Sequence, residues 1–371
     1  MPMPMLEGGR RVEVADMVLL LTNVDMERIT GLETPAVIDA IEDAYRGLGR
    51  GDAVNPARRR LTTPQREGGA TYWFNNIMGA VPAIDTLALR IDSTAFRMVE
   101  VGGMSRKVRA GDFVGLVFLF NTATGELEAV LHDHFLSTRR VAATGAVGTR
   151  YLARPDARVL GLFGSGQQAT AQVHAMAAVR PLELVNVYSP NAEHRHAFAE
   201  RLTQEVGVEV RAVDDPKAVV EGADIVVTAT NSRSPVFDGG WLEPGVHVET
   251  IVGTDQSASG SEIDHEAVRR ADLIVTNLKE QIQVDRQPKL LWAIEEGLLP
   301  WDQIHDLGEV VAGIAPGRTS DQQITLHDNN TGMGIQFAAL GSLILRLARE
   351  QDLGTPLPDE LFISRGGDYA P

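Results

Sequence analysis

The stretch "VLGLFGSGQQATAQVHAM", residues 159–176, decides the fold class. It contains the pattern G-x-G-x-x-A between an apolar run typical of a strand and an alanine-rich run typical of a helix. The first glycine permits a tight turn, the second lets a pyrophosphate approach the backbone, and the small third residue lets the helix pack on the strand. The stretch therefore predicts a dinucleotide site, although a tight turn without a ligand and a site for another adenosyl ligand stay open. The residues expected at the cofactor here are Gly164, Ser165, Gly166, Gln167 and Gln168.

Short apolar runs alternate with helical patterns after residue 158. The expected strands include "LELVNVYS", "DIVVTAT", "GVHVETIVG" and "DLIVTN", and "AEHRHAFAERLTQEV" reads as a helix between the first two. Strands that alternate with helices indicate a parallel, doubly wound sheet. We therefore expect an α/β fold with a Rossmann-type domain over residues 146–325.

The chain upstream of this region has a different pattern. The runs "LALRIDSTAF", "DFVGLVFLFN" and "ELEAVLHDH" are apolar and rich in β-formers, and the last two are separated by the turn "TATGE". They predict strands with a hairpin. The next segment, "FLSTRRVAATGAVGTRYLAR", predicts a helix capped near Ser137. The alanines and glycines of this helix would allow it to pack closely against another element.

Composition excludes several classes of function. The 371 residues carry a formal net charge of −16 and no cysteine. An acidic chain repels phosphate backbones, so we expect no nucleic-acid partner. The absence of cysteine removes disulfides, thiol nucleophiles and cysteine-bound metal. Apolar runs such as "FVGLVFLF" are too short to span a membrane and the first residues lack a signal-peptide core, so we expect a cytoplasmic protein without a membrane partner.

The end of the second expected strand bears on the choice between two nicotinamide cofactors. An acidic residue there binds the ribose 2′-hydroxyl of NAD and repels the 2′-phosphate of NADP. The segment "VYSPNAEHRHAF" instead offers Ser189 and Asn191, with Arg195 nearby. Neutral donors beside a cation suit a phosphate, so the sequence favours NADP(H) over NAD(H). The alternative is that Arg195 is a solvated helix residue.

Polar residues follow two further expected strands. Thr230, Asn231 and Ser232 come after the fourth strand of the nucleotide fold and offer groups for the ribose or carboxamide. Gly253 permits close approach of the cofactor, and Asp255 follows where ligands of parallel sheets collect. A carboxylate there can exchange a proton with a substrate nitrogen. The simpler alternative is an aspartate that caps a turn.

Motifs in order along the chain resemble the ornithine cyclodeaminase/μ-crystallin family. They are "LSTRRVAATGAVGTRYLARPDA", "LGLFGSGQQA", "VEGADIVVTATNSRSPVFDGGWLEPGVHVETIVGTD", "EID", "LGEVVAGIAPGR" and "ITLHDNNTGMGIQ". The resemblance implies an enzyme that uses NAD(H) or NADP(H) on amino acids and imines. It also implies a homodimer, and a second α+β domain for substrate binding and dimerisation built from residues 1–145 and 326–371.

The resemblance also implies a set of site residues. Asp255 matches the family's catalytic aspartate, and Arg140 matches the arginine that pairs the substrate carboxylate. One of the three arginines at 58–60 matches a further carboxylate ligand, with Arg60 favoured. Arg90 stands where many members have a lysine. An arginine can still bind a carboxylate at this position, but it cannot exchange a proton at neutral pH. The expected catalytic residues are Asp255, Arg90 and Arg140.

Two departures from the family pattern bear on the reaction. Besides Arg90, the pair Gln336-Phe337 replaces an acidic residue of many relatives and removes a carboxylate for a basic substrate. We therefore expect an imine reductase or amino-acid dehydrogenase rather than an ornithine cyclodeaminase that releases ammonia. A non-catalytic NADPH-binding protein remains the alternative of another class. His132 and His134 lack a third ligand in sequence, so we expect no metal.

Overall fold

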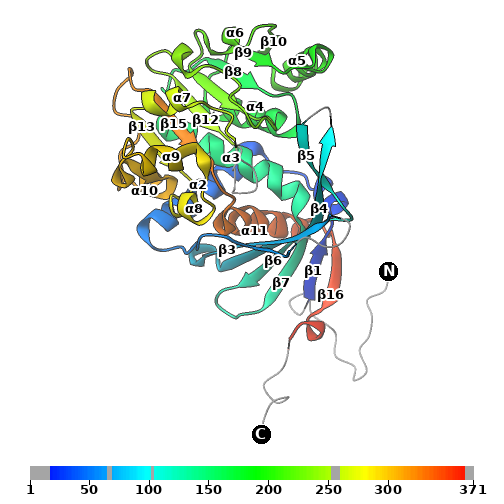
Figure 1. Cartoon of the computed structure of the whole chain (residues 1–371). Helices are drawn as coiled ribbons and strands as arrows, with labels where there is room; N and C mark the ends of the chain where they lie inside the picture. Colours follow the sequence, from blue (N-terminus) through cyan, green and yellow to red (C-terminus); the bar gives the residue numbers. More distant parts are fainter. Residues whose placement is uncertain (1–16, 65–68, 102–103, 252–259, 364–371) are drawn as a thin grey trace, which may run out of the picture.

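The computed structural model describes residues 17–64, 69–101, 104–251 and 260–363. It contains two separate sheets, the parallel one in the upper part of Figure 1 and the mixed one in the lower part. The strands are β1 (Met17–Leu21), β2 (Arg59–Thr62), β3 (Thr71–Val81), β4 (Thr86–Val101), β5 (Met104–Arg109), β6 (Val114–Asn121), β7 (Leu127–His132), β8 (Val159–Phe163), β9 (Leu184–Tyr188), β10 (Glu209–Ala212), β11 (Ile225–Thr228), β12 (His247–Thr250), β13 (Leu273–Thr276), β14 (Ile304–Asp306), β15 (Thr325–Asp328) and β16 (Thr355–Pro358). The helices are α1 (Asn23–Glu27), α2 (Thr34–Arg50), α3 (Asp133–Leu152), α4 (Gln167–Val179), α5 (Ala192–Val206), α6 (Lys217–Val220), α7 (His265–Arg270), α8 (Glu280–Val284), α9 (Pro288–Glu295), α10 (Leu307–Val311) and α11 (Gly334–Glu350).

The second half of the chain forms the parallel sheet that the sequence predicts. Its strand order is β10-β9-β8-β11-β12-β15-β13-β14, and each pairing is parallel. The chain reverses its direction of travel across the sheet between β8 and β11. Doubly wound sheets bind ligands beside such a switch point, at the carboxyl ends of the strands. The predicted Rossmann-type sheet is confirmed. It also includes β15 (Thr325–Asp328), most of which lies beyond residue 325, the expected end of this domain.

The first part of the chain forms a mixed sheet together with its C-terminal segment. The order is β16-β1-β7-β6-β4-β3-β2, with β5 on β4, and β16 comes from the far end of the chain. Helix α11 lies across one face of this sheet (Figure 1). Its inner side and the facing strand residues form one apolar core with α2 and α3. The α+β domain built from both ends of the chain is therefore confirmed.

Helix α3 connects the two sheets and lies between them (Figure 1). Its glycines let it approach the parallel sheet closely, because a Cβ at Gly148 would come within 2.4 Å of the His327 ring. The predicted cap near Ser137 is wrong. The helix begins one turn earlier, at Asp133, with His132 in an extended conformation as the capping residue. The carboxylate of Asp133 lies in the first turn, where the helix dipole favours a negative charge.

Candidate active site

The glycine turn between β8 and α4 has the geometry that a diphosphate site needs. Gly164 has φ of 114°, and a Cβ there would lie 2.3 Å from the carbonyl oxygen of Ala229, so only glycine fits. Gly166 precedes α4, and no atom lies within 4 Å of the place where its Cβ would be. The buried Oε1 atom of Gln168 has no hydrogen-bond partner. Open space at a helix N-terminus beside an unsatisfied polar atom fits a dinucleotide diphosphate.

The residues expected near the adenosine ribose lie together at the end of β9. The Ser165 hydroxyl donates to Ser189 Oγ at 3.0 Å, and Asn191 caps α5 by accepting from the His194 amide. Arg195 is buried, donates to the Ser189 carbonyl at 3.0 Å, and pairs with Asp214. Arg195 is therefore not a solvated helix residue. The carboxylate that β9 lacks comes from the loop after β10.

The polar residues after β11 are held by a buried glutamate. The Thr230 amide donates to Glu262 Oε1 at 2.8 Å, and its hydroxyl donates to the same atom at 2.5 Å. Thr230 Oγ1 in turn accepts from the Ser232 amide at 2.9 Å, while Asn231 is exposed. Burial raises the pKa of Glu262 above its usual value. Glu262 therefore fixes this loop at the carboxyl edge of the sheet.

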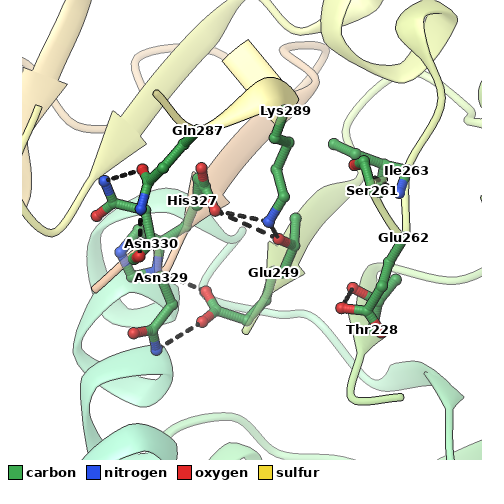
Figure 2. Close-up of polar contacts among 12 residues, drawn as sticks. Thr228, Glu249, Ser261, Glu262, Ile263, Gln287, Lys289, His327, Asn329 and Asn330 are labelled. Carbon is green, nitrogen blue, oxygen red and sulfur yellow. Dashed lines mark hydrogen bonds and ion pairs between the residues drawn. The ribbon is translucent and has the colours of Figure 1, made fainter. Parts of the chain in front are cut away.

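A second buried network crosses the ends of β12 and β15. The Lys289 ammonium pairs with Asp328 Oδ1 at 2.7 Å and also contacts the Thr250 hydroxyl (Figure 2). Deeper in the sheet, His327 Nδ1 lies 2.6 Å from Glu249 Oε2. These buried groups are paired as buried charges must be. None of these pairs was expected from the sequence, because the partners lie 39 or 78 positions apart in the chain.

Gly253 and Asp255 lie in 252–259, outside the described residues. Their assignment rests on the sequence.

Arg140 projects from the first turns of α3 toward α11. Its Nη1 donates to Gln336 Oε1 at 3.1 Å, and Gln336 also donates to Tyr45 and Thr144. The Arg140 Nε is buried and has no hydrogen-bond partner. Burial and the positive charge of Arg90 lower the pKa of Arg140 to about 9. An anion beside Arg140 would satisfy the free donor and stabilise the cation.

Arg90 lies in the same cluster, on the face of β4 that points toward α3. Its Nε donates to Asp133 Oδ2 at 2.7 Å, and its Nη1 lies 3.2 Å from Asp92 Oδ2. A buried arginine in a strand needs a partner, and Arg90 has two. The expectation that Arg90 faces the site is consistent with this placement. Its charge is already matched by protein carboxylates, whereas that of Arg140 is not.

Arg58 and Arg60 join the two domains at Asp285. Arg58 Nη2 lies 2.9 Å from Asp285 Oδ2, and Arg60 Nη1 lies 3.6 Å from the same oxygen. Arg60 also donates to Asn75 Oδ1 at 2.8 Å, which continues the cluster toward Asp92. The structure thus brings Arg60, Arg90 and Arg140 into one neighbourhood, whereas Arg59 is exposed.

Three acidic members of this cluster were missed from the sequence. Asp92 lies two residues after Arg90, so the period of a strand places both side chains on one face, a signal that was available. Asp133 lies between His132 and His134, which were considered as metal ligands. Asp285 follows a short helix and carries no local signal.

A cavity of about 760 Å³ lies on the other side of α3, between α1, α2, α3 and α4, and includes Ser165 and Gly166 in its lining. Arg139, the neighbour of Arg140, lines it. Across the described ranges, no group of three or more histidine, aspartate or glutamate residues is placed to hold a metal ion. Within the same ranges, no helix has the length and apolarity needed to cross a membrane.

The fold and the glycine turn define a dinucleotide-binding α/β protein. The model of the ornithine cyclodeaminase/mu-crystallin family matches residues 15–351. The chain belongs to this family.

Named relatives extend the similarity over almost the whole chain. An iminosuccinate reductase of Paracoccus denitrificans is 31% identical over 330 residues, which is 88% of this chain and 96% of that protein. A Rhizobium meliloti protein named only as a dehydrogenase is 36% identical over 338 residues, 91% of this chain and 97% of its own. The solved Δ1-pyrroline-2-carboxylate reductase of Thermococcus litoralis, in complex with NADH and L-proline, superimposes with a TM-score of 0.78 at 27% identity. That match covers 92% of this chain and all of that structure.

Proposed function

We propose that the protein is an NAD(P)-dependent oxidoreductase that reduces the C=N bond of an imino acid to an amino acid. The observation that carries the proposal is Arg140, whose buried and unpartnered Nε lies beside Arg90 between the two domains. A guanidinium with an unused donor is a site for a planar carboxylate. Relatives named as imine reductases support the same chemistry.

The carboxyl edge of the parallel sheet would hold the cofactor. Gly164 and Gly166 leave room for the diphosphate, and Thr230 and Ser232 line the neighbouring strand end. The bound nicotinamide supplies the hydride for the carbon of the C=N bond. We propose that NADP(H) is preferred, because Arg195 supplies a cation next to the neutral Ser189.

The chain's own residues orient the substrate and move the proton. Arg140 binds the carboxylate, and Arg90 and Arg60 hold the acidic side chains around it. Asp255 holds the proton that the substrate nitrogen receives, so that one hydride and one proton together give the amine. Arg90, which contacts Asp92 and Asp133, serves in binding.

We further propose that each chain has one domain over residues 1–145 and 326–371 and the other over 146–325.

We also propose a homodimer. The support for the dimer is the outer face of the mixed sheet. There Leu116, Phe118 and Phe120 alternate with buried residues and stay half-exposed. Leu89 and Ile91 of β4 pair with them and extend the apolar surface. A contiguous apolar face of this kind marks an interaction site, and light scattering of the purified chain tests the dimer.

The proposed reaction is tested with Δ1-pyrroline-2-carboxylate and either reduced cofactor. The expected result is loss of the reduced-nicotinamide absorbance with formation of proline. Ammonia release from ornithine without net change in the cofactor would instead identify a cyclodeaminase. Cofactor binding without turnover over a panel of imines would identify a binding protein.

The role of Asp255 has its own test. Asp255→Asn keeps the shape of the side chain and removes the titrating group, so turnover should fall by about 100-fold while cofactor binding persists. Full turnover with intact cofactor binding would show that Asp255 does not handle the proton.

A further inference from the structure

Asp92 is an acidic residue in the arginine cluster with one oxygen unused. Its Oδ2 is 3.2 Å from Arg90 Nη1 and accepts from Asn75 Nδ2 at 3.3 Å. Its Oδ1 is buried and has no hydrogen-bond partner among the residues that the structure describes. A buried carboxylate oxygen without a donor is unfavourable unless a ligand or water supplies one. Asp92 therefore presents an open acceptor, and a negative charge, to whatever lies against Arg90.

The balance of arginines and aspartates in the cluster indicates how many carboxylates of a substrate it can bind. Its described members are four arginines and three aspartates: Arg58, Arg60, Arg90, Arg140, Asp92, Asp133 and Asp285. Each aspartate contacts Arg58, Arg60 or Arg90, whereas Arg140 bonds to the neutral Gln336. Among the described residues, Arg140 is therefore the arginine of this cluster that contacts no carboxylate.

We propose that Asp92 is a specificity-determining residue that restricts the substrate to imino acids with a single carboxylate. The inference rests on the proposed function of this site. Arg140 accepts the one carboxylate, and Asp92 Oδ1 accepts an N–H or O–H donor of the substrate. A second carboxylate would meet Asp92 without a free arginine to offset it, and like charges brought together in a desolvated site discriminate strongly.

The contrast with dicarboxylate substrates makes the inference specific. A substrate with two carboxylates needs a second place for a negative charge, and Asp92 puts a further negative charge beside Arg90, which already pairs with Asp133. Replacement of Asp92 by its neutral isostere should therefore remove the charge that repels a second carboxylate, without altering Arg140. The isostere keeps an oxygen to accept from Arg90, so the fold of β4 is expected to persist.

The test compares Asp92→Asn with Asp85→Asn, which removes the same charge from an exposed turn of the same sheet. Each protein is saturated with NADPH, and the affinities for L-proline and L-aspartate are measured by calorimetry. Proline has one carboxylate and aspartate has two, and neither reacts with the reduced cofactor. The unchanged protein and Asp85→Asn should bind proline at least about tenfold more tightly than aspartate. In Asp92→Asn that preference should fall about tenfold through a gain in aspartate binding.

Two results would overturn the proposal. One is tighter binding of aspartate than of proline by the unchanged protein, and the other is an equal loss of both ligands in Asp92→Asn, which would indicate a merely structural role. Asp92→Glu covers the case in which Asp92→Asn does not fold. It keeps the charge and should keep the preference for proline, and loss of that preference would also refute the proposal. Failure of the proposed reaction is seen separately, as absence of imine reduction by a protein that still binds proline.

Discussion

The nucleotide edge of the parallel sheet and the arginine cluster are built in opposite ways. The nucleotide edge is local, because the turn at Gly164 lies between a strand and a helix that are consecutive in the chain. Its polar contacts are short in sequence: Asn191 caps its own helix, and the Ser165–Ser189 and Thr230–Glu262 hydrogen bonds span 24 and 32 positions. The arginine cluster takes residues from β2, β4, α3 and the end of α8, more than 200 positions apart. Its charges are matched only after both domains have folded.

This difference determines where the protein tolerates change. Backbone geometry shapes the nucleotide edge, so the presence or absence of a Cβ is decisive there. Paired charges shape the arginine cluster, so removal of one partner leaves another buried and unpaired. The first region should be sensitive to small changes in volume and the second to changes in charge.

The largest effect should come from Arg140, which contacts no carboxylate within the described ranges. Arg140→Met keeps much of the volume and removes the cation, so kcat/KM for Δ1-pyrroline-2-carboxylate should fall about 100- to 1,000-fold. Arg150→Met is the matched control, because Arg150 lies near the far end of the same helix, where it pairs with Asp39 and Glu42, and should change kcat/KM less than about threefold. Similar losses in both variants would show that the helix, and not the carboxylate contact, had been damaged.

A pair of glycine variants tests the local construction of the nucleotide edge. Gly164→Ala places a Cβ against the Ala229 carbonyl at a φ that other residues rarely adopt, and should reduce the free energy of unfolding by about 2–3 kcal/mol. Gly166→Ala has open space and should unfold within about 1 kcal/mol of the unchanged protein. It should nevertheless bind NADPH more weakly, because the methyl group occupies the diphosphate space. Denaturant titration and fluorescence titration measure the two effects, and equal stability of both variants would contradict the argument.

The same contrast explains what the sequence could and could not predict. The parallel sheet, the glycine turn and the placement of Arg195 depend on periodicity and on neighbours in the chain, which a sequence displays directly. Arg140 and Arg90 were placed through resemblance to a family. Asp92 was within reach of the strand period. Asp285 was not, because its partner Arg58 lies 227 positions away.

The start of α3 shows a second limit. Ser137 is a preferred capping residue and sits before an alanine-rich run, so the sequence favours it. The helix instead starts at Asp133, because β7 ends at His132 and the chain turns directly into the helix. Tertiary packing therefore decided a boundary that local preference placed one turn too late.

A charge-removing variant at the end of β9, where the adenosine ribose is expected, tests the comparison further. Asp214 is 85% exposed in its side chain and neutralises the buried Arg195. Asp214→Asn should free that cation and raise the affinity for NADPH about fivefold, with less than a twofold change for NADH. Asp215→Asn removes the same charge one residue further on and serves as the control. A parallel rise for both cofactors would mean that Arg195 does not reach the 2′-phosphate.

The smallest effect concerns the pH dependence of the arginine cluster. The pKa of Arg140 is lowered to about 9, so its cation is fully present near pH 7 and is lost as the pH rises through that value. Binding of a carboxylate should weaken in the same direction, about twofold at pH 9 relative to pH 7. Pyrrole-2-carboxylate is a suitable ligand, because its ring nitrogen does not titrate in this range, and calorimetry in Arg140→Lys provides the comparison. Lysine lacks the planar fork and binds more weakly throughout. If the affinity of the unchanged protein stays constant up to pH 9, a charge other than that of Arg140 governs the carboxylate, and the cluster is less dependent on this single cation than its contacts indicate.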